Sequence, residues 1–227
     1  MLCADNRGVG LAAEGDSLSR HLISEPNGVP IGGRPLDAVF IGASTGGPKA
    51  LERILASLPA DFPAPIAVCQ HMPEGFTAFW ADRLDSVCQL TVREASNGSS
   101  LDPGTVYIAP IGRHLRVRAD SDGRRRISLD RDFADSLHVP SIDIMMSSAA
   151  QVYGSRGLAV LLTGLGADGA LGMLAMRRAG AHTIVESQDT AVAYSMPGSA
   201  VQAGAAVEEA PLDEIPELIL QRVTGRM

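Results

Sequence analysis

The stretch GASTG at residues 42–46 places a serine between a short apolar run and a segment that opens with Pro48. The pattern G-x-S-x-G at a strand-to-helix turn is typical of a nucleophile elbow, in which a sharp turn presents the serine oxygen beyond the edge of a sheet. The first turn of the following helix adds N–H groups and a positive dipole end for a developing oxyanion. The motif therefore favours acyl chemistry with Ser44 as the nucleophile.

Two other interpretations of the same motif stay open, because five residues with three fixed small positions occur often. Ser44 is also suited to cap the helix that follows a tight turn, and small residues ahead of a helix are suited to cradle a phosphate. The P-loop pattern fails, since Pro48 follows Gly47 where that pattern requires lysine. The G-x-G-x-x-G pattern is absent as well.

A serine nucleophile needs a base, most often histidine, that a carboxylate orients. His71 directly follows an apolar run at residues 64–70, so it is the preferred base, although a polar residue that simply ends a strand fits that position equally well. His138, just ahead of an expected helix, is the reserve candidate. The remaining histidines are less well placed, in the lead-in, in an insertion, or at the start of a strand: His21, His114 and His182.

The carboxylate that best completes the set is Asp168, in the glycine-rich stretch TGLGADGA. Aspartate is a favoured helix cap, so Asp168 is expected to be able to cap the helix that follows it and still face His71. Asp143 and Asp189 are weaker choices, and Cys69 fits a plain core position better than a thiol nucleophile. The resulting order, Ser-His-Asp, differs from that of ordinary α/β-hydrolases and of the two large serine-protease families.

Strands that alternate with helices are expected to position these residues. Apolar runs bounded by turn residues predict strands at 37–43, 64–70, 157–164 and 182–187, and periodic segments predict helices at 48–58, 75–84, 140–153, 168–180 and 212–223, with a short one near Met196–Pro197. Short runs at 105–110, 114–119 and 124–130 predict a small antiparallel insertion. The fold class is therefore α/β, a three-layer αβα arrangement with a doubly wound, mainly parallel sheet that binds ligands beyond the carboxyl ends of its strands.

Composition narrows the function classes. The formal net charge is −7 and no basic stripe is present, which argues against sequence-independent nucleic-acid binding. Three cysteines, with no apolar run of about 20 residues and no secretory signal, indicate a cytoplasmic protein without membrane insertion. Neither C-x-x-C nor H-E-x-x-H occurs, so no metal and no cofactor is expected.

Residues 1–35 lack periodicity and end in the glycine- and proline-rich stretch EPNGVPIGGRP, so we expect a flexible lead-in or linker. Ordered structure is expected from Leu36 onward. The domain division is therefore 1–35 and 36–227.

Several motifs, in this order, make the chain similar to a known family over about residues 36–222: IGASTGGPKAL, QHMPEGFT, LDPGTVYIAP, HVPSID, LLTGLGADGALGMLAMRRAGA and VAYSMPGSAV. The chain resembles the catalytic domain of CheB, the chemotaxis receptor methylesterase. The resemblance implies hydrolysis of glutamyl methyl esters on the cytoplasmic helices of methyl-accepting chemoreceptors, with release of methanol. Many members also deamidate receptor glutamines.

The resemblance also assigns residues. It implies Ser44 as nucleophile, His71 as base and Asp168 as orienting carboxylate, with Thr45 shaping the site and the backbone N–H of Leu165 in the oxyanion site. Methionine is usual where Leu165 stands, and glycine is common where Ser195 stands. Members of the family usually carry an N-terminal receiver domain, and the 35 residues of the lead-in stand in its place, so we expect no receiver domain in this chain and an esterase without a phosphorylation switch in cis.

Overall fold

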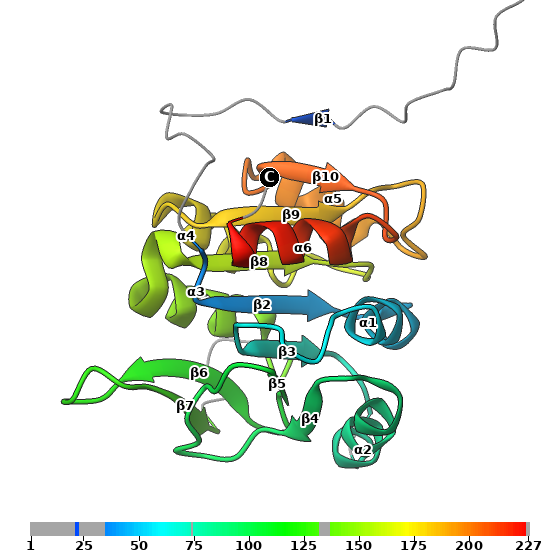
Figure 1. The fold of residues 1–227 in the computed structure, drawn as a ribbon. Coiled ribbons are helices and arrows are strands. Elements are labelled where there is room, and N and C mark those ends of the chain that lie inside the picture. The colour runs from blue at the N-terminus through cyan, green and yellow to red at the C-terminus, as the bar shows by residue number, and fades with distance from the viewer. Residues whose placement is uncertain (1–20, 23–34, 74, 132–136, 226–227) are drawn as a thin grey trace, which may run out of the picture.

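The computed structural model describes residues 21–22, 35–73, 75–131 and 137–225. Its main sheet has the strand order β1-β10-β9-β8-β2-β3-β5-β4, and all neighbours are parallel except β1 and β10 (Figure 1). The strands are β1 (His21–Leu22), β2 (Ala38–Ala43), β3 (Ile66–Gln70), β4 (Thr91–Glu94), β5 (Thr105–Ile108), β8 (Gly157–Leu161), β9 (His182–Glu186) and β10 (Glu208–Ala210).

Helices cover both faces of this sheet. One face carries α1 (Gly47–Ala56), α2 (Thr77–Val87) and α6 (Ile215–Thr224). The other carries α3 (Ile142–Tyr153), α4 (Ala170–Arg178) and α5 (Ser195–Gln202), with the antiparallel pair β6 (His114–Ala119) and β7 (Arg125–Asp130) beside them. A single 3₁₀ turn, Gly154–Arg156, links α3 to β8. The expected three-layer α/β class is confirmed.

The two cores follow from the two-residue period of the central strands. In β2, Val39 and Ile41 pack into the core under α1 and α6, while Phe40 packs into the core under α3. All six β2 residues are buried, which is why the strand reads as a continuous apolar run rather than an alternating one. The sequence signal was therefore strong for this strand, and its predicted position is confirmed.

The expected antiparallel insertion is wrong in its first strand. β5 pairs in parallel with β3 and β4 inside the main sheet, and only β6 and β7 form an antiparallel pair. The reason lies in burial, because all four β5 residues are buried, as a strand with two neighbours requires. Edge strand β4 and strand β10 were not predicted, since each is short and carries charged residues.

The lead-in falls mostly outside the described residues, at 1–20 and 23–34. His21, Leu22 and Pro35 are described there, and His21 and Leu22 pair antiparallel with Glu209 and Glu208 of β10. Among the helices of the described ranges, none is long and apolar enough to cross a membrane.

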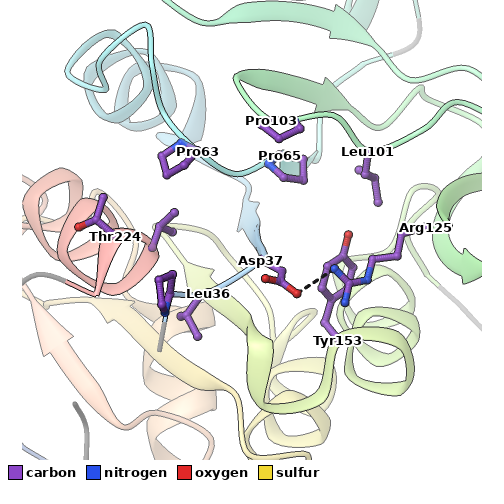
Figure 2. Close-up of a pocket in the computed structure, with 11 residues that line it drawn as sticks. Leu36, Asp37, Pro63, Pro65, Leu101, Pro103, Arg125, Tyr153 and Thr224 are labelled. Carbon is purple, nitrogen blue, oxygen red and sulfur yellow. Dashed lines mark hydrogen bonds and ion pairs between the residues drawn. The ribbon is translucent and has the colours of Figure 1, made fainter. Parts of the chain in front are cut away.

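A cavity of about 540 Å³ opens at the amino-terminal ends of β2, β3 and β5 (Figure 2). Its polar wall is Asp37, which pairs with Arg125 and Arg156, and the Arg125 guanidinium lies 4.3 Å over the ring of Tyr153. Ligands of parallel α/β sheets bind at the opposite edge, beyond the carboxyl ends of the strands. This cavity therefore lies at the end of the sheet away from the predicted site.

Candidate active site

Ser44 and His71 each follow the last residue of a central strand. β2 and β3 are paired in register at Ala43 and Gln70, so the next residues, Ser44 and His71, leave the sheet side by side. The backbone N–H of His71 donates to the carbonyl of Ala43 at 3.1 Å, and the N–H of Ser44 donates to the carbonyl of Thr163, beyond β8, at 3.0 Å. The sheet itself thus sets the separation of the predicted nucleophile and base.

The turn at Ser44 has the tight geometry that its small neighbours predict. Gly46 has φ +84°, a conformation that residues with a Cβ rarely adopt. Gly164 lies so close that a Cβ there would stand 2.8 Å from the Cβ of Ser44. Gly46 is the N-cap residue of α1 and no side chain caps that helix. The hydroxyl of Ser44 is therefore not a helix cap, which removes that alternative.

Gln70, the last residue of β3, supports both neighbours and was not predicted. Its side-chain amide donates to the carbonyl of Ser44 at 2.9 Å and to the carbonyl of His71 at 2.7 Å. One buried amide therefore joins the main chains of the two residues. Gln70 begins the family motif QHMPEGFT, but that resemblance assigned it no role, and a glutamine at a strand end carries no local signal for this contact.

His71 and Asp168 form a direct pair. Nε2 of His71 lies 2.8 Å from Oδ2 of Asp168, and their side chains are only 11% and 9% exposed. Nδ1 of His71 is buried and has no hydrogen-bond partner among the described residues. With Nε2 engaged by the carboxylate, Nδ1 is the nitrogen left to accept a proton. The two nitrogens therefore exchange the roles they have in the chymotrypsin triad.

Asp168 does not cap its own helix, which corrects that part of the expectation. The N-cap residue of α4 is Gly169, without a side-chain cap. The carboxylate instead reaches the first turn of α3, where Oδ2 accepts from the N–H of Ile142 at 2.8 Å and Oδ1 accepts from the N–H of Asp143 at 3.0 Å. The hydroxyl of Ser141 also donates to Oδ1, at 2.9 Å.

These donors decide the charge state of Asp168. Burial alone would raise the pKa of this carboxyl, but hydrogen bonds from His71 and from the first turn of α3 outweigh burial and hold the pKa below its ordinary value of 3.8. Asp168 is therefore an anion at neutral pH, as a carboxylate that orients an imidazole must be.

The other candidates are placed as follows. The ring of His138 stacks on the ring of His71, with centroids 4.1 Å apart and planes 17° from parallel. Burial, followed by the charge of His71, lowers the pKa of His138. Burial raises the pKa of Cys69 well above 9.0, so its thiol stays protonated. His182 pairs with Glu208 at the start of β9, away from this edge.

The turn after β8 contains Leu165, whose backbone N–H is the predicted oxyanion donor. Among the described residues, no group accepts a hydrogen bond from the backbone N–H of Leu165 or of Thr45. The side chain of Thr163 ties the two loops, since its hydroxyl donates to the carbonyl of Thr45 at 2.9 Å. The buried carboxylate of Glu186 accepts from the N–H of Thr163 at 2.8 Å and was not predicted.

In the described part of the chain, no group of three or more His, Cys, Asp or Glu side chains is arranged to hold a metal ion. The Cys69 thiol lies in the core. The Asp143 carboxylate accepts hydrogen bonds from backbone N–H groups at the start of α4.

Comparisons with known proteins identify relatives of this chain. The profile of the family described as CheB methylesterase matches residues 39–219. A protein-glutamate methylesterase/protein-glutamine glutaminase of Nitratidesulfovibrio vulgaris is 46% identical over 184 residues, covering 81% of this chain and 50% of that protein. A protein of the same name from Bordetella bronchiseptica is 47% identical over 189 residues, covering 83% of this chain and 53% of that protein.

Among solved structures, the catalytic domain of the Thermotoga maritima CheB methylesterase matches with a TM-score of 0.79 and 41% identity. The match covers 83% of this chain and 99% of that one. The chain spans about half the length of the curated relatives it matches. Because the family profile matches residues 39–219, this chain belongs to the CheB methylesterase family.

Proposed function

We propose that the chain is a serine hydrolase that removes methyl groups from glutamate methyl esters of chemoreceptors in the cytoplasm. The observation that carries the proposal is the pair of His71 and anionic Asp168 at the strand ends where the main chains of Ser44 and His71 lie side by side. Nδ1 of His71 has no partner among the described residues, so it is available to take a proton. The names of the relatives support the same substrate. By the same chemistry the chain would also deamidate receptor glutamines.

In the first half of the reaction, Nδ1 of His71 takes the hydroxyl proton as Oγ of Ser44 attacks the ester carbonyl. The carbonyl oxygen becomes an oxyanion, and the backbone N–H groups of Leu165 and Thr45, from which no described group accepts, are the donors assigned to it. Asp168 stabilises the imidazolium. The tetrahedral intermediate then collapses, the methoxy oxygen takes the proton from Nδ1, and methanol leaves an acyl-serine.

In the second half, water attacks the acyl-serine and gives its proton to Nδ1 of His71. The second tetrahedral intermediate collapses, Ser44 recovers its proton, and the free glutamate side chain departs. For a glutamine substrate the leaving group is ammonia and the remaining steps are unchanged. His71 acts first as base and then as acid in each half, so both halves need the same neutral imidazole.

Exposed apolar side chains around the triad support a macromolecular substrate. Leu165 follows Gly164, which packs on Ser44, and Val192 packs on Gly46. Leu137, next to the His138 that stacks on His71, is fully exposed. Large exposed apolar groups around a site mark a surface that another macromolecule covers. A helical receptor segment would cover them as its ester enters the site.

We propose that residues 36–227 form the methylesterase domain; the predicted lead-in, residues 1–35, lies mostly outside the described residues. The profile match at residues 39–219 supports this proposal.

The test is methanol release from a cytoplasmic receptor fragment methylated on glutamate. The purified chain is expected to release methanol, and the Ser44→Ala variant to release none while it keeps the thermal stability of the parent. Turnover of p-nitrophenyl acetate without methanol release would indicate a hydrolase for another ester. Binding of the fragment without hydrolysis of either substrate would indicate a non-catalytic module and overturn the proposal.

A further inference from the structure

The first turns of α3 and α4 cap each other through two carboxylates. Asp168, just before α4, accepts from the N–H groups of Ile142 and Asp143 in α3. Asp143, in the first turn of α3, accepts at Oδ1 from the N–H groups of Gly169 at 2.9 Å and Gly172 at 2.6 Å in α4. Each helix thus has its N-terminal donors satisfied by a residue of the other, which ties the two ends together.

Ser141 takes part in this cap in a way that an ordinary cap residue does not. Its Oγ accepts from the N–H of Ile144 at 3.3 Å, the usual contact of an N-cap residue. Its hydroxyl proton is then directed at Oδ1 of Asp168, 2.9 Å away. The backbone N–H of Ser141 donates to Nδ1 of His114 at 3.2 Å, and Ser141 is 2% exposed. The hydroxyl is therefore fixed in both of its roles.

We propose that Ser141 and Asp143 are positioning residues of the hydrolytic site, which hold Asp168 against His71 and set how strongly its carboxylate attracts the imidazolium. This inference rests on the proposed function for its consequence in catalysis. The two residues act with opposite sign. Ser141 donates a hydrogen bond to the carboxylate and disperses its charge, whereas the Asp143 carboxylate places a second negative charge near it.

Few titratable groups lie near the His71–Asp168 pair in the described part of the chain. Burial, the first cause, raises the pKa of Asp143, and the charge of Asp168 raises it further. The titratable groups around the Asp168 carboxylate come from β3, β6, the segment before α3, and α3: His71, Cys69, His114, His138 and Asp143. Cys69 is a neutral thiol, and His114 contacts Ser141 rather than the carboxylate. The groups that mainly influence the charge of the His71–Asp168 pair are therefore Ser141, Asp143 and the stacked His138.

The test follows the ring of His71 by NMR as pH is varied, in a Ser44→Ala background that needs no activity. His71→Gln assigns the signal. In Ser141→Ala the carboxylate loses a donor and holds the charged imidazole more firmly, so the titration midpoint of the ring is expected to rise by roughly 0.5 pH unit. In Asp143→Asn the amide oxygen still accepts from α4 but the negative charge is gone, so the midpoint is expected to fall by a similar amount.

Matched variants separate positioning from simple stability. Ser141→Thr keeps the hydroxyl and is expected to restore the parent midpoint. Ser148→Ala removes a buried hydroxyl of the same helix that contacts Val117 and Met145, so it is expected to lower thermal stability without moving the midpoint. The acid limb of the rate profile for methanol release, measured with Ser44 present, is expected to move as the NMR midpoints do.

Shifts of opposite sign in Ser141→Ala and Asp143→Asn support the inference. Unchanged midpoints in folded variants, or shifts of the same sign, overturn it. If Ser141→Ala does not fold, the downward shift in Asp143→Asn and the parent midpoint in Ser141→Thr decide the matter. Absence of methanol release by the parent chain would defeat the proposed function alone, because the NMR midpoints are read without turnover.

Discussion

Replacing Asp168 by asparagine keeps the shape of the side chain and reverses half of its hydrogen bonding. The carboxylate accepts from four donors: Nε2 of His71, the hydroxyl of Ser141, and the N–H groups of Ile142 and Asp143. Asparagine has one oxygen and one NH₂ group. Whichever way the amide lies, its NH₂ group faces one of the two backbone N–H groups of α3, which is then left without an acceptor.

The size of the effect follows from these contacts. A buried N–H without an acceptor costs about 1–3 kcal/mol, and the lost anion at the helix N-terminus adds about 0.3–1 kcal/mol. We therefore expect Asp168→Asn to lower the free energy of unfolding by about 2–3 kcal/mol at pH 7. In catalysis the imidazolium loses its counter-charge and its tautomer is no longer enforced, for which a serine-protease triad loses about 10⁴-fold in kcat.

Urea unfolding and methanol release, measured on the same preparations, check both numbers. The pKa of Asp168 in the folded chain lies below its ordinary value of 3.8. Its contribution to stability is therefore fully present above pH 3.8 and is lost as the pH falls through the folded pKa, so the gap between parent and variant narrows in acid. An asparagine variant with unchanged stability and less than about a tenfold loss of kcat would refute the role given to Asp168.

Three further results are expected. His71→Ala abolishes methanol release whereas His138→Ala retains it, measured as kcat; the reverse outcome would transfer the base to His138. Glu208→Gln lowers the free energy of unfolding by about 2 kcal/mol at pH 7. Burial raises the pKa of Glu208, but hydrogen bonds from His182 and Arg222 bring it below 4.5. This difference is therefore full above pH 4.5 and fades as the pH falls through the folded pKa, as urea titrations at several pH values would show. Deletion of residues 1–34 leaves both kcat and KM unchanged; a higher KM alone would indicate a tether, and a higher kcat an inhibitory lead-in.

The parts of the fold that were predictable are those where burial requires a particular pattern of apolar residues. β2 and β8 are buried on both faces, so their apolar runs stand out, and α1 shows its buried face at Leu51, Ile54 and Leu55. The parallel pairing of β5 was not predictable from its own residues, because a buried strand of four residues looks the same whichever way its neighbours run.

The candidate site divides in the same way. Ser44 and His71 follow strands whose ends were recognisable in the sequence. Because ligands bind beyond the carboxyl ends of parallel strands, both residues were predicted to lie in one site. The target of the Asp168 carboxylate was not predictable, since a helix cap is a local pattern and this carboxylate caps a helix about 25 residues earlier in the chain. Gln70 and Glu186 act through main-chain groups of other loops, which no local pattern reports.

The most direct test of the account is methanol release from a methylated receptor fragment by the parent chain and by Ser44→Ala, compared at equal concentration of folded protein. The account predicts methanol in proportion to the esters lost with the parent chain and none with the variant, and acyl transfer to the side chain of Ser44 in a rapid-quench experiment. Equal methanol release by the two proteins would contradict the assignment of Ser44 as nucleophile, and with it the role of the His71–Asp168 pair.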